Sequence, residues 1–341
     1  VNLYIMKLKN IVGLISAIGL ILISCSKESM VDGPDVTGKS DTSFDITLVS
    51  EGVETKASAP GYTYATADEI KIQTCAIAVF DTSGKMVGFN YSTFSGVSND
   101  TYESKEAYKI TGIETRSGDV KILVVANPVL SEAALKALNT YAAFKAQSIA
   151  HNDANATSLT ASNLIKFGEV TKTLGTTTKQ TIVVPLTQVA ARVDVTYNVT
   201  IANGWKVKLG DNTIRNINVQ SNIFLPEYKI NEYTFGAQTL KDKSNVAISD
   251  NKISFYTYEK DNPVTILVPV ELSYSSRKEN KTYQLPLLPT FVAQQCSTNG
   301  FVHGHYYEVT GNMSIDLELN CTIKWEVETL EPVTVTIPDF K

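Results

Sequence analysis

The chain has 341 residues, more than a single domain of ordinary size needs. Hydrophobic residues make up 43% of it and the net charge is −5 at pH 7, which is the composition of a mildly acidic globular protein. This balance argues against a nucleic-acid partner, because phosphate binding requires a basic patch. The nearest approach to one, Arg277, Lys278 and Lys281, also contains Glu279 and is interpreted as a solvated hairpin tip.

The first segment has the pattern of a secretory signal peptide. Lys7 and Lys9 precede an almost wholly apolar run, Ile11–Ile23, which is shorter than the ~20 residues of a stable membrane span. The run ends in the sequence LISC, similar to the lipobox of bacterial lipoproteins, in which the cysteine becomes the lipid-bearing N-terminus. We predict a lipoprotein signal peptide over residues 1–25, with Cys25 lipidated and the chain tied to a membrane by acyl chains. The alternative is an ordinary anchor helix with a chance cysteine.

A tether and a short strand follow. Residues 26–42 are polar without apolar periodicity, which predicts a flexible tether. Phe44, Ile46 and Leu48 then alternate with polar residues, the pattern of a half-buried strand. The next segment, Glu51–Ala67, is a polar loop that contains Lys56.

Most later elements are also predicted to be strands. One helix is expected to begin at the N-cap Ser131 and to bury Leu135, Leu138 and Ala142, and residues 150–180 form a long polar connection in which short strands could hide. The predicted strands are Lys71–Asp81, Met86–Tyr91 after a turn at Ser83-Gly84, Val120–Ala126, Gln180–Leu186, Val189–Ile201, Thr213–Val219, Lys252–Tyr258, Val264–Tyr274, Thr282–Leu288, His305–Ile315, Cys321–Val327 and Pro332–Ile337. This series predicts an all-β fold of sandwiches or barrels, with an N-terminal domain over 43–187 and a C-terminal domain over 188–341.

Three cysteines remain after Cys25, an odd number that cannot pair completely within one chain. Cys296 and Cys321 could form a disulfide, although their spacing does not require it. Cys75 lies in a run that is apolar on both faces, so we interpret it as a small buried hydrophobic residue.

No motif predicts catalysis, a metal or a cofactor. His303 and His305 would share one face of a strand, but they supply only two ligands, and spacing places no carboxylate near them. Asp and Glu are scattered, and nothing points to a paired-carboxylate glycosidase. Trp205 and Trp325 with many tyrosines could line a sugar-binding platform, the alternative being that they serve packing.

Five segments in order resemble the fimbrillins, the type V pilus subunits of Gram-negative gut and oral anaerobes. They are KIQTCAIAVFDTSGKMVG (Lys71–Gly88), ILVVANP (Ile122–Pro128), VPLTQVAARVDV (Val184–Val195), FYTYEKDNPVTILVPVELSY (Phe255–Tyr274) and HGHYYEVTGNM (His303–Met313). The resemblance implies two tandem β-sandwich (transthyretin-like) domains with one short helix in the first. It also implies a lipoprotein that reaches the outer membrane and a surface fimbria, without catalysis.

The resemblance further implies how such subunits join. A trypsin-like processing protease cuts the loop after the first strand, that strand leaves, and a strand from another copy or a related subunit fills the groove. Here the removable strand would contain Phe44, Ile46 and Leu48, and the cut would follow Lys56. The family usually has Arg at the cut, so either a Lys-cutting protease acts or this subunit keeps its strand, as suits an anchor or accessory role.

The donor segment is predicted at the C-terminus. Val333, Val335 and Ile337 alternate with threonines, as the apolar residues of the first strand alternate with polar ones. The alternative is that this segment is the last strand of its own domain. The sequence therefore predicts a fimbrial structural subunit. The competing hypothesis is a monomeric surface lipoprotein, or an accessory subunit at the tip or anchor, that binds a glycan or a host protein.

Overall fold

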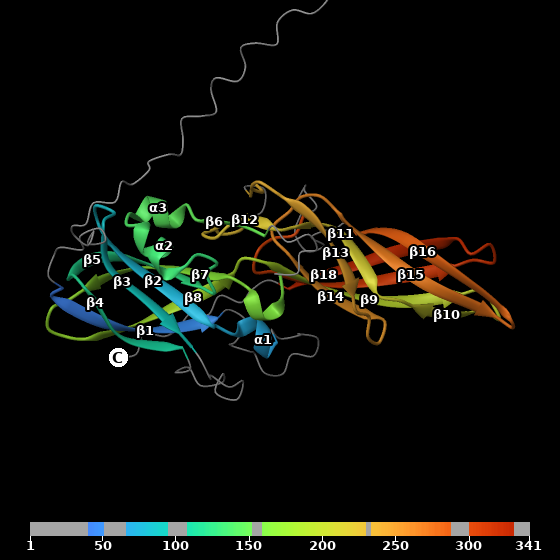
Figure 1. Cartoon of the computed structure of the whole chain (residues 1–341), viewed down its shortest axis with the longest axis horizontal. Helices are drawn as coiled ribbons and strands as arrows, with labels where there is room; N and C mark the ends of the chain where they lie inside the picture. Colours follow the sequence, from blue (N-terminus) through green and yellow to red (C-terminus); the bar gives the residue numbers. More distant parts are fainter. Residues whose placement is uncertain are drawn as a thin grey trace, which may run out of the picture. The chain divides into compact units, whose positions relative to one another are not determined.

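The computed structural model describes residues 40–50, 66–94, 108–151, 159–229, 233–287 and 300–330. These residues form mostly β-strands in several sheets, with a few short helices (Figure 1). The predicted all-β class is confirmed.

A seven-stranded sheet contains strands from residues 42 to 188, in the order β3-β2-β5-β7-β8-β1-β4. Its strands are β1 (Thr42–Ser50), β2 (Thr74–Asp81), β3 (Met86–Thr93), β4 (Lys109–Thr115), β5 (Gly118–Ala126), β7 (Lys166–Leu174) and β8 (Gln180–Gln188). Strands β7 and β8 pair at only two positions, Lys166 with Gln188 and Phe167 with Thr187. The sheet therefore turns at this point into two layers.

A hydrophobic core fills the space between these layers. It combines alternate residues of β2 and β5 with the buried residues of β8, β1 and β4. Cys75 on β2 is fully buried within it, as predicted. Burial also raises the pKa of the Cys75 thiol, so the side chain serves as a small apolar group.

The strands after residue 190 form two further sheets. The four-stranded sheet has the order β14-β9-β17-β18, and the five-stranded sheet has the order β10-β15-β11-β13 with β16 also paired to β15. The strands are β9 (Ala191–Ile201), β10 (Lys206–Leu209), β11 (Asn212–Asn218), β13 (Leu240–Val246), β14 (Lys252–Thr257), β15 (Val264–Tyr274), β16 (Arg277–Leu287), β17 (Tyr306–Ile315) and β18 (Cys321–Leu330). The β15–β16 hairpin turns between Tyr274 and Arg277, which confirms the predicted hairpin tip.

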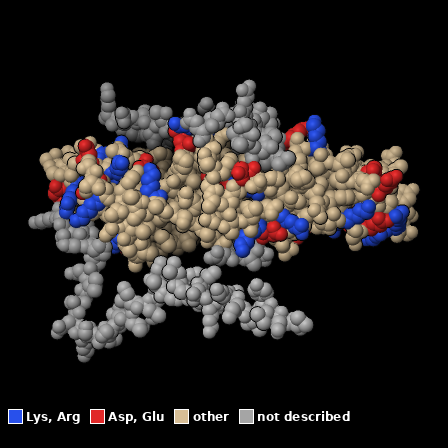
Figure 2. All heavy atoms as spheres, turned by 90° about the horizontal axis from the view of Figure 1, so that it is seen from above, with Lys and Arg blue, Asp and Glu red and all other residues tan. Residues whose placement is uncertain are grey.

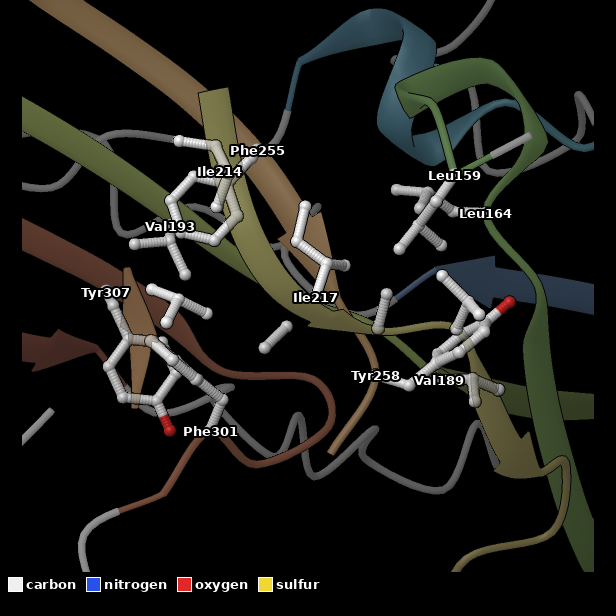
Figure 3. Close-up of a cluster of buried hydrophobic side chains, with 14 of the residues drawn as sticks. Leu159, Leu164, Val189, Val193, Ile214, Ile217, Phe255, Tyr258, Phe301 and Tyr307 are labelled. Atoms are coloured by element: carbon white, nitrogen blue, oxygen red, sulfur yellow. The ribbon is translucent and has the colours of Figure 1, made fainter. Parts of the chain in front are cut away.

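A second hydrophobic core joins these sheets to the preceding part of the chain. Figure 3 shows part of it, with Val193, Ile214, Phe255 and Tyr307 on one side of the view and Leu159 and Leu164 on the other. Strands β6 (Ser148–Ala150) and β12 (Gln220–Asn222) also pair with each other, which links the residues before 188 to those after it. Contacts group the described residues into one compact unit, so the division into domains at 187 and 188 stays a prediction.

The helices differ from the single one predicted. They are α1 (Ala67–Ile70), α2 (Glu132–Ala137), α3 (Tyr141–Lys145) and the 3₁₀ turn η2 (Ala161–Asn163). Ser131 caps α2 as expected, but Thr140 begins a new helix by accepting the Ala143 N–H at 3.2 Å. This second cap ends the predicted helix early, and Phe144 is buried in place of Ala142.

Candidate functional site

Strand β1 lies inside the seven-stranded sheet, between β8 and β4. It pairs in parallel with β8 from Phe44–Gln180 to Ser50–Leu186, and antiparallel with β4. The candidate functional site is therefore β1 together with the two strands that flank it, visible in the lower layer of Figure 1.

The predicted apolar side of β1 faces the core. Phe44 and Ile46 are fully buried and Leu48 is 4% exposed. Burial of each such side chain contributes roughly 1.5–3 kcal/mol, so β1 supplies a substantial share of this core. The period-two pattern thus correctly identified the buried face of the strand.

The ladder between β1 and β4 contains a β-bulge. Phe44 pairs with Ile113 and Ile46 with Ile110, so β4 carries one residue more than β1 between these pairs. Gly112 lies in the bulge with φ +70°, a conformation that favours glycine.

Asp45 closes this bulge from the outer face of β1. Its Oδ1 accepts the Gly112 N–H at 2.9 Å and lies 2.7 Å from Lys179 Nζ, in the turn that leads into β8. The Asp45 side chain is 13% exposed. Its pKa lies below the ordinary aspartate value, mainly because of the hydrogen bond from Lys179, with a further contribution from Gly112 that opposes the effect of desolvation.

The beginning of β1 has a second set of polar contacts. Asp41 accepts the Ser117 N–H at 2.6 Å and the Ser117 hydroxyl at 2.8 Å, and the Thr42 hydroxyl donates to the Gly175 carbonyl at 2.7 Å. A polar cavity of about 540 Å³ opens here, lined by residues that include Ser43, Glu114 and the threonines before Lys179. Polar groups therefore fix the register of β1 at this end.

Strand β4 also contacts β3, the strand at the other end of the sheet order. A Cβ atom at Gly88 would lie 2.7 Å from the Glu114 carbonyl oxygen, and the Thr115 hydroxyl donates to the Val87 carbonyl at 3.3 Å. Thus β4 is held on both sides, by β1 and by the close approach of β3.

The remaining predicted site residues lie outside the described part of the chain. They are Cys25, Lys56, Val333, Val335 and Ile337. Cys296, proposed as a disulfide partner of Cys321, also lies outside it. Their roles stay predictions. None of the helices among the described residues is long and apolar enough to cross a membrane.

A buried polar cluster surrounds His303, and spacing did not predict it. The His303 ring and the Tyr233 hydroxyl both contact the Glu259 carboxylate, which is 4% exposed. Burial, together with Glu259, raises the pKa of Tyr233. Spacing along the sequence predicted no carboxylate near this histidine, and the fold corrects that prediction. Among the described residues, however, no group of three or more His, Cys, Asp or Glu side chains could hold a metal ion.

An ionic network connects α1 to the four-stranded sheet. Arg192 Nη1 lies 2.7 Å from Glu69 Oε2 and Arg192 Nη2 lies 2.9 Å from Asp194 Oδ2. The Tyr256 hydroxyl donates to Glu69 Oε1 at 3.1 Å. Glu69 also completes a capping box with Thr66, so this short helix is fixed by both local and distant contacts.

The two tryptophans serve packing more than an open sugar platform. Trp325 lies against Gly311 and donates its indole N–H to the Pro286 carbonyl at 2.7 Å. Trp205 lies beside Tyr274 with ring centroids 5.6 Å apart, and Arg277 lies over its ring. Both rings are thus engaged within the chain, although Tyr274 remains 48% exposed.

The chain matches a known protein family over more than half of its length. A family model described as "Major fimbrial subunit protein (FimA)" matches residues 43–273. A relative, "Putative fimbrium tip subunit Fim1F" of Parabacteroides distasonis, is 29% identical over 340 residues, and the alignment covers 94% of this chain and 95% of that protein.

Solved structures show the same fold. The crystal structure of a "putative cell adhesion protein" from Parabacteroides distasonis matches with a TM-score of 0.62 at 18% identity, covering 87% of this chain and 99% of that chain. A fimbrial assembly protein from the same species matches with a TM-score of 0.50 at 25% identity, covering 84% and 98%. The first likeness concerns the fold alone.

Proposed function

Because the chain belongs to the major fimbrial subunit (FimA) family, we propose that it is a structural subunit of a cell-surface fimbria and joins its neighbours by strand exchange. The observation that carries this proposal is the position of β1. It fills one slot between β4 and β8, and it presents Phe44, Ile46 and Leu48 to the core. A strand with the same alternation could occupy that slot from another chain.

Proteolysis would free β1. The polar loop with Lys56 separates β1 from α1 in the sequence, so a cut there removes the covalent link between this strand and the rest of the sheet. The family usually has Arg at this place, and Lys56 implies a protease that cuts after lysine. Lipidation of Cys25 would hold the uncut chain at the outer membrane until that step.

The C-terminal segment is the proposed donor. Val333, Val335 and Ile337 offer three apolar side chains at period two, the spacing that the slot of β1 requires. Association with other fimbrial subunits follows from the family, and exchange through this segment is the specific mechanism proposed for it.

A terminal position in the fimbria is the second candidate. The relative that is 29% identical carries the name of a tip subunit. A subunit at the end of a fibre needs only one of the two elements, either the groove or the donor strand. In that role this chain would accept a strand without passing one on.

Treatment of the purified full chain with a lysine-specific protease tests the proposal. We expect N-terminal sequencing to find the cut after Lys56, and electron microscopy to show filaments that disappear when residues 331–341 are deleted. A Lys56→Ala variant is the control and should stay uncut at this site.

The outcomes separate the candidates. Loss of the β1 segment in exchange for a strand from another subunit, without filaments, would assign the terminal role. If the cut chain keeps its own β1 segment and takes up no other strand, exchange of strands is the wrong mechanism.

A further inference from the structure

One carboxylate on β1 connects both walls of the groove that the loss of β1 would open. Asp45 contacts Gly112 in the bulge of β4 and Lys179 at the entrance to β8. The three apolar side chains of β1 point to the core, whereas this contact lies on the opposite side of the strand. This contact can therefore distinguish between incoming strands independently of their apolar pattern.

When β1 leaves, two hydrogen-bond donors remain around the position that its carboxylate oxygen occupied. The Gly112 N–H belongs to a bulge, so β4 cannot satisfy it through the regular ladder. Lys179 is half exposed and can turn to water while the groove is open. When a new strand enters, a carboxylate at the position of Asp45 would again accept the Gly112 N–H and pair with Lys179, which a neutral side chain cannot do.

We propose that this pair of donors makes the groove selective for strands that carry an acidic residue between the two apolar residues at the positions of Phe44 and Ile46. The proposal rests on strand exchange as the function of the site. It assigns to Gly112 and Lys179 the role of a carboxylate receptor, and it describes the preferred partner as a β-strand with the pattern apolar–acidic–apolar.

The chain's own C-terminal segment does not have this pattern. Thr334 lies between Val333 and Val335, and Thr336 lies between Val335 and Ile337. A threonine hydroxyl can accept one N–H, but it brings no charge to Lys179. This C-terminal segment therefore matches the apolar pattern of the slot alone, and a strand from a different subunit that also carries the acidic residue should bind more tightly.

A competition between two peptides tests the proposal. The full chain would carry a protease recognition sequence inserted within residues 51–65 and would be cut after folding. It is then incubated at pH 7 with an equimolar mixture of two isotopically distinct peptides, one with the sequence of residues 42–50 and one with Asp45→Thr. Mass spectrometry of the protein-bound fraction gives the capture ratio.

We expect the aspartate peptide to be captured about threefold more, because an ion pair with a half-exposed lysine contributes only modestly to binding. A Lys179→Met variant of the chain should reduce this ratio, whereas Lys172→Met, on the exposed side of β7, should leave it unchanged.

The outcomes distinguish this inference from the function on which it rests. Equal capture of both peptides would show that the groove has no carboxylate preference while strand exchange stands. Capture of neither peptide would instead contradict strand exchange itself. A preference that Lys179→Met leaves intact would overturn the assigned role of Lys179.

Discussion

Lys166 is a charged residue in the interior at the beginning of β7. Its side chain is 1% exposed, and Nζ donates to the Leu164 carbonyl at 3.4 Å. Desolvation lowers the pKa of Lys166 to about 7, and the charge of Glu69 offsets only part of that effect. Above pH 7 the folded chain therefore favours the neutral amine of Lys166.

This burial predicts a pH dependence of stability. In the unfolded chain the lysine pKa is about 10.4, so between pH 7 and 10 the unfolded state binds more protons and a rise in pH stabilises the folded state. Relative to a Lys166→Met variant, the wild-type free energy of unfolding should increase by about 2 kcal/mol from pH 7 to pH 9. Urea denaturation at several pH values measures this difference.

The comparison with a variant is needed because Lys260 acts in the same direction. Burial lowers the pKa of Lys260 to about 8, so it contributes to the same rise. Lys172→Met, at an exposed position of the same strand, is the matched control and should follow the wild type. A parallel pH profile for Lys166→Met and wild type would contradict the prediction.

Single residues of this kind could not be found from the sequence. Lys166 lies in the polar stretch 150–180, where nothing distinguishes it from a surface lysine. The contact of Glu259 with His303 joins positions 44 residues apart, which spacing along one strand cannot relate. Phe44, Ile46 and Leu48 were predictable because a two-residue period on one strand is local information.

Among the elements, strands with regular alternation were predicted well and irregular ones were missed. Val264–Tyr274 has the predicted bounds of β15. Strand β4 was missed because its buried residues Ile110 and Ile113 are three apart, a spacing that the bulge at Gly112 creates. Strands β7, β10 and β13 were not predicted because their sequences are polar, and pairing with neighbouring strands is what makes them strands.

A reversible crosslink between β1 and β4 tests whether release of β1 is required for assembly. Thr47 and Lys109 are antiparallel partners, at a Cα separation of about 4.5–5.5 Å that suits a disulfide. The pair Thr47→Cys and Lys109→Cys should prevent loss of the β1 segment after the loop is cut. A reducing agent should restore it, as followed by mass spectrometry of the released peptide.

The control crosslink leaves β1 alone. Ser273→Cys with Lys278→Cys would join partners in the β15–β16 hairpin and should not affect release. Assembly that proceeds unchanged while β1 stays crosslinked would mean that the subunits join through another surface.

At the scale of the whole molecule, charges of both signs lie on the surface. Lys and Arg side chains are interspersed with Asp and Glu on the face shown in Figure 2. The family and the all-β class were both predictable from the sequence, because they depend on patterns repeated along the chain.

Attachment to the membrane can be tested on the intact precursor. Cys25→Ser removes the thiol that would take the lipid, so the protein should move from the detergent phase to the aqueous phase in Triton X-114 partitioning of cells. Cys75→Ser, at a buried position, is the control and should not change the partitioning of folded protein. A Cys25→Ser protein that still enters the detergent phase would indicate a different anchor.

The network around Glu69 determines which of the two new chain ends stays with the subunit after the proposed cut. Thr66 is the first described residue after the loop, and it caps helix α1. Glu69 of this helix forms an ion pair with Arg192. A break after Lys56 thus leaves only residues 57–65 between the new amino terminus and Thr66. The segment before the cut can dissociate together with β1. The new amino terminus stays attached to the subunit, because the helix that follows it is held by these contacts.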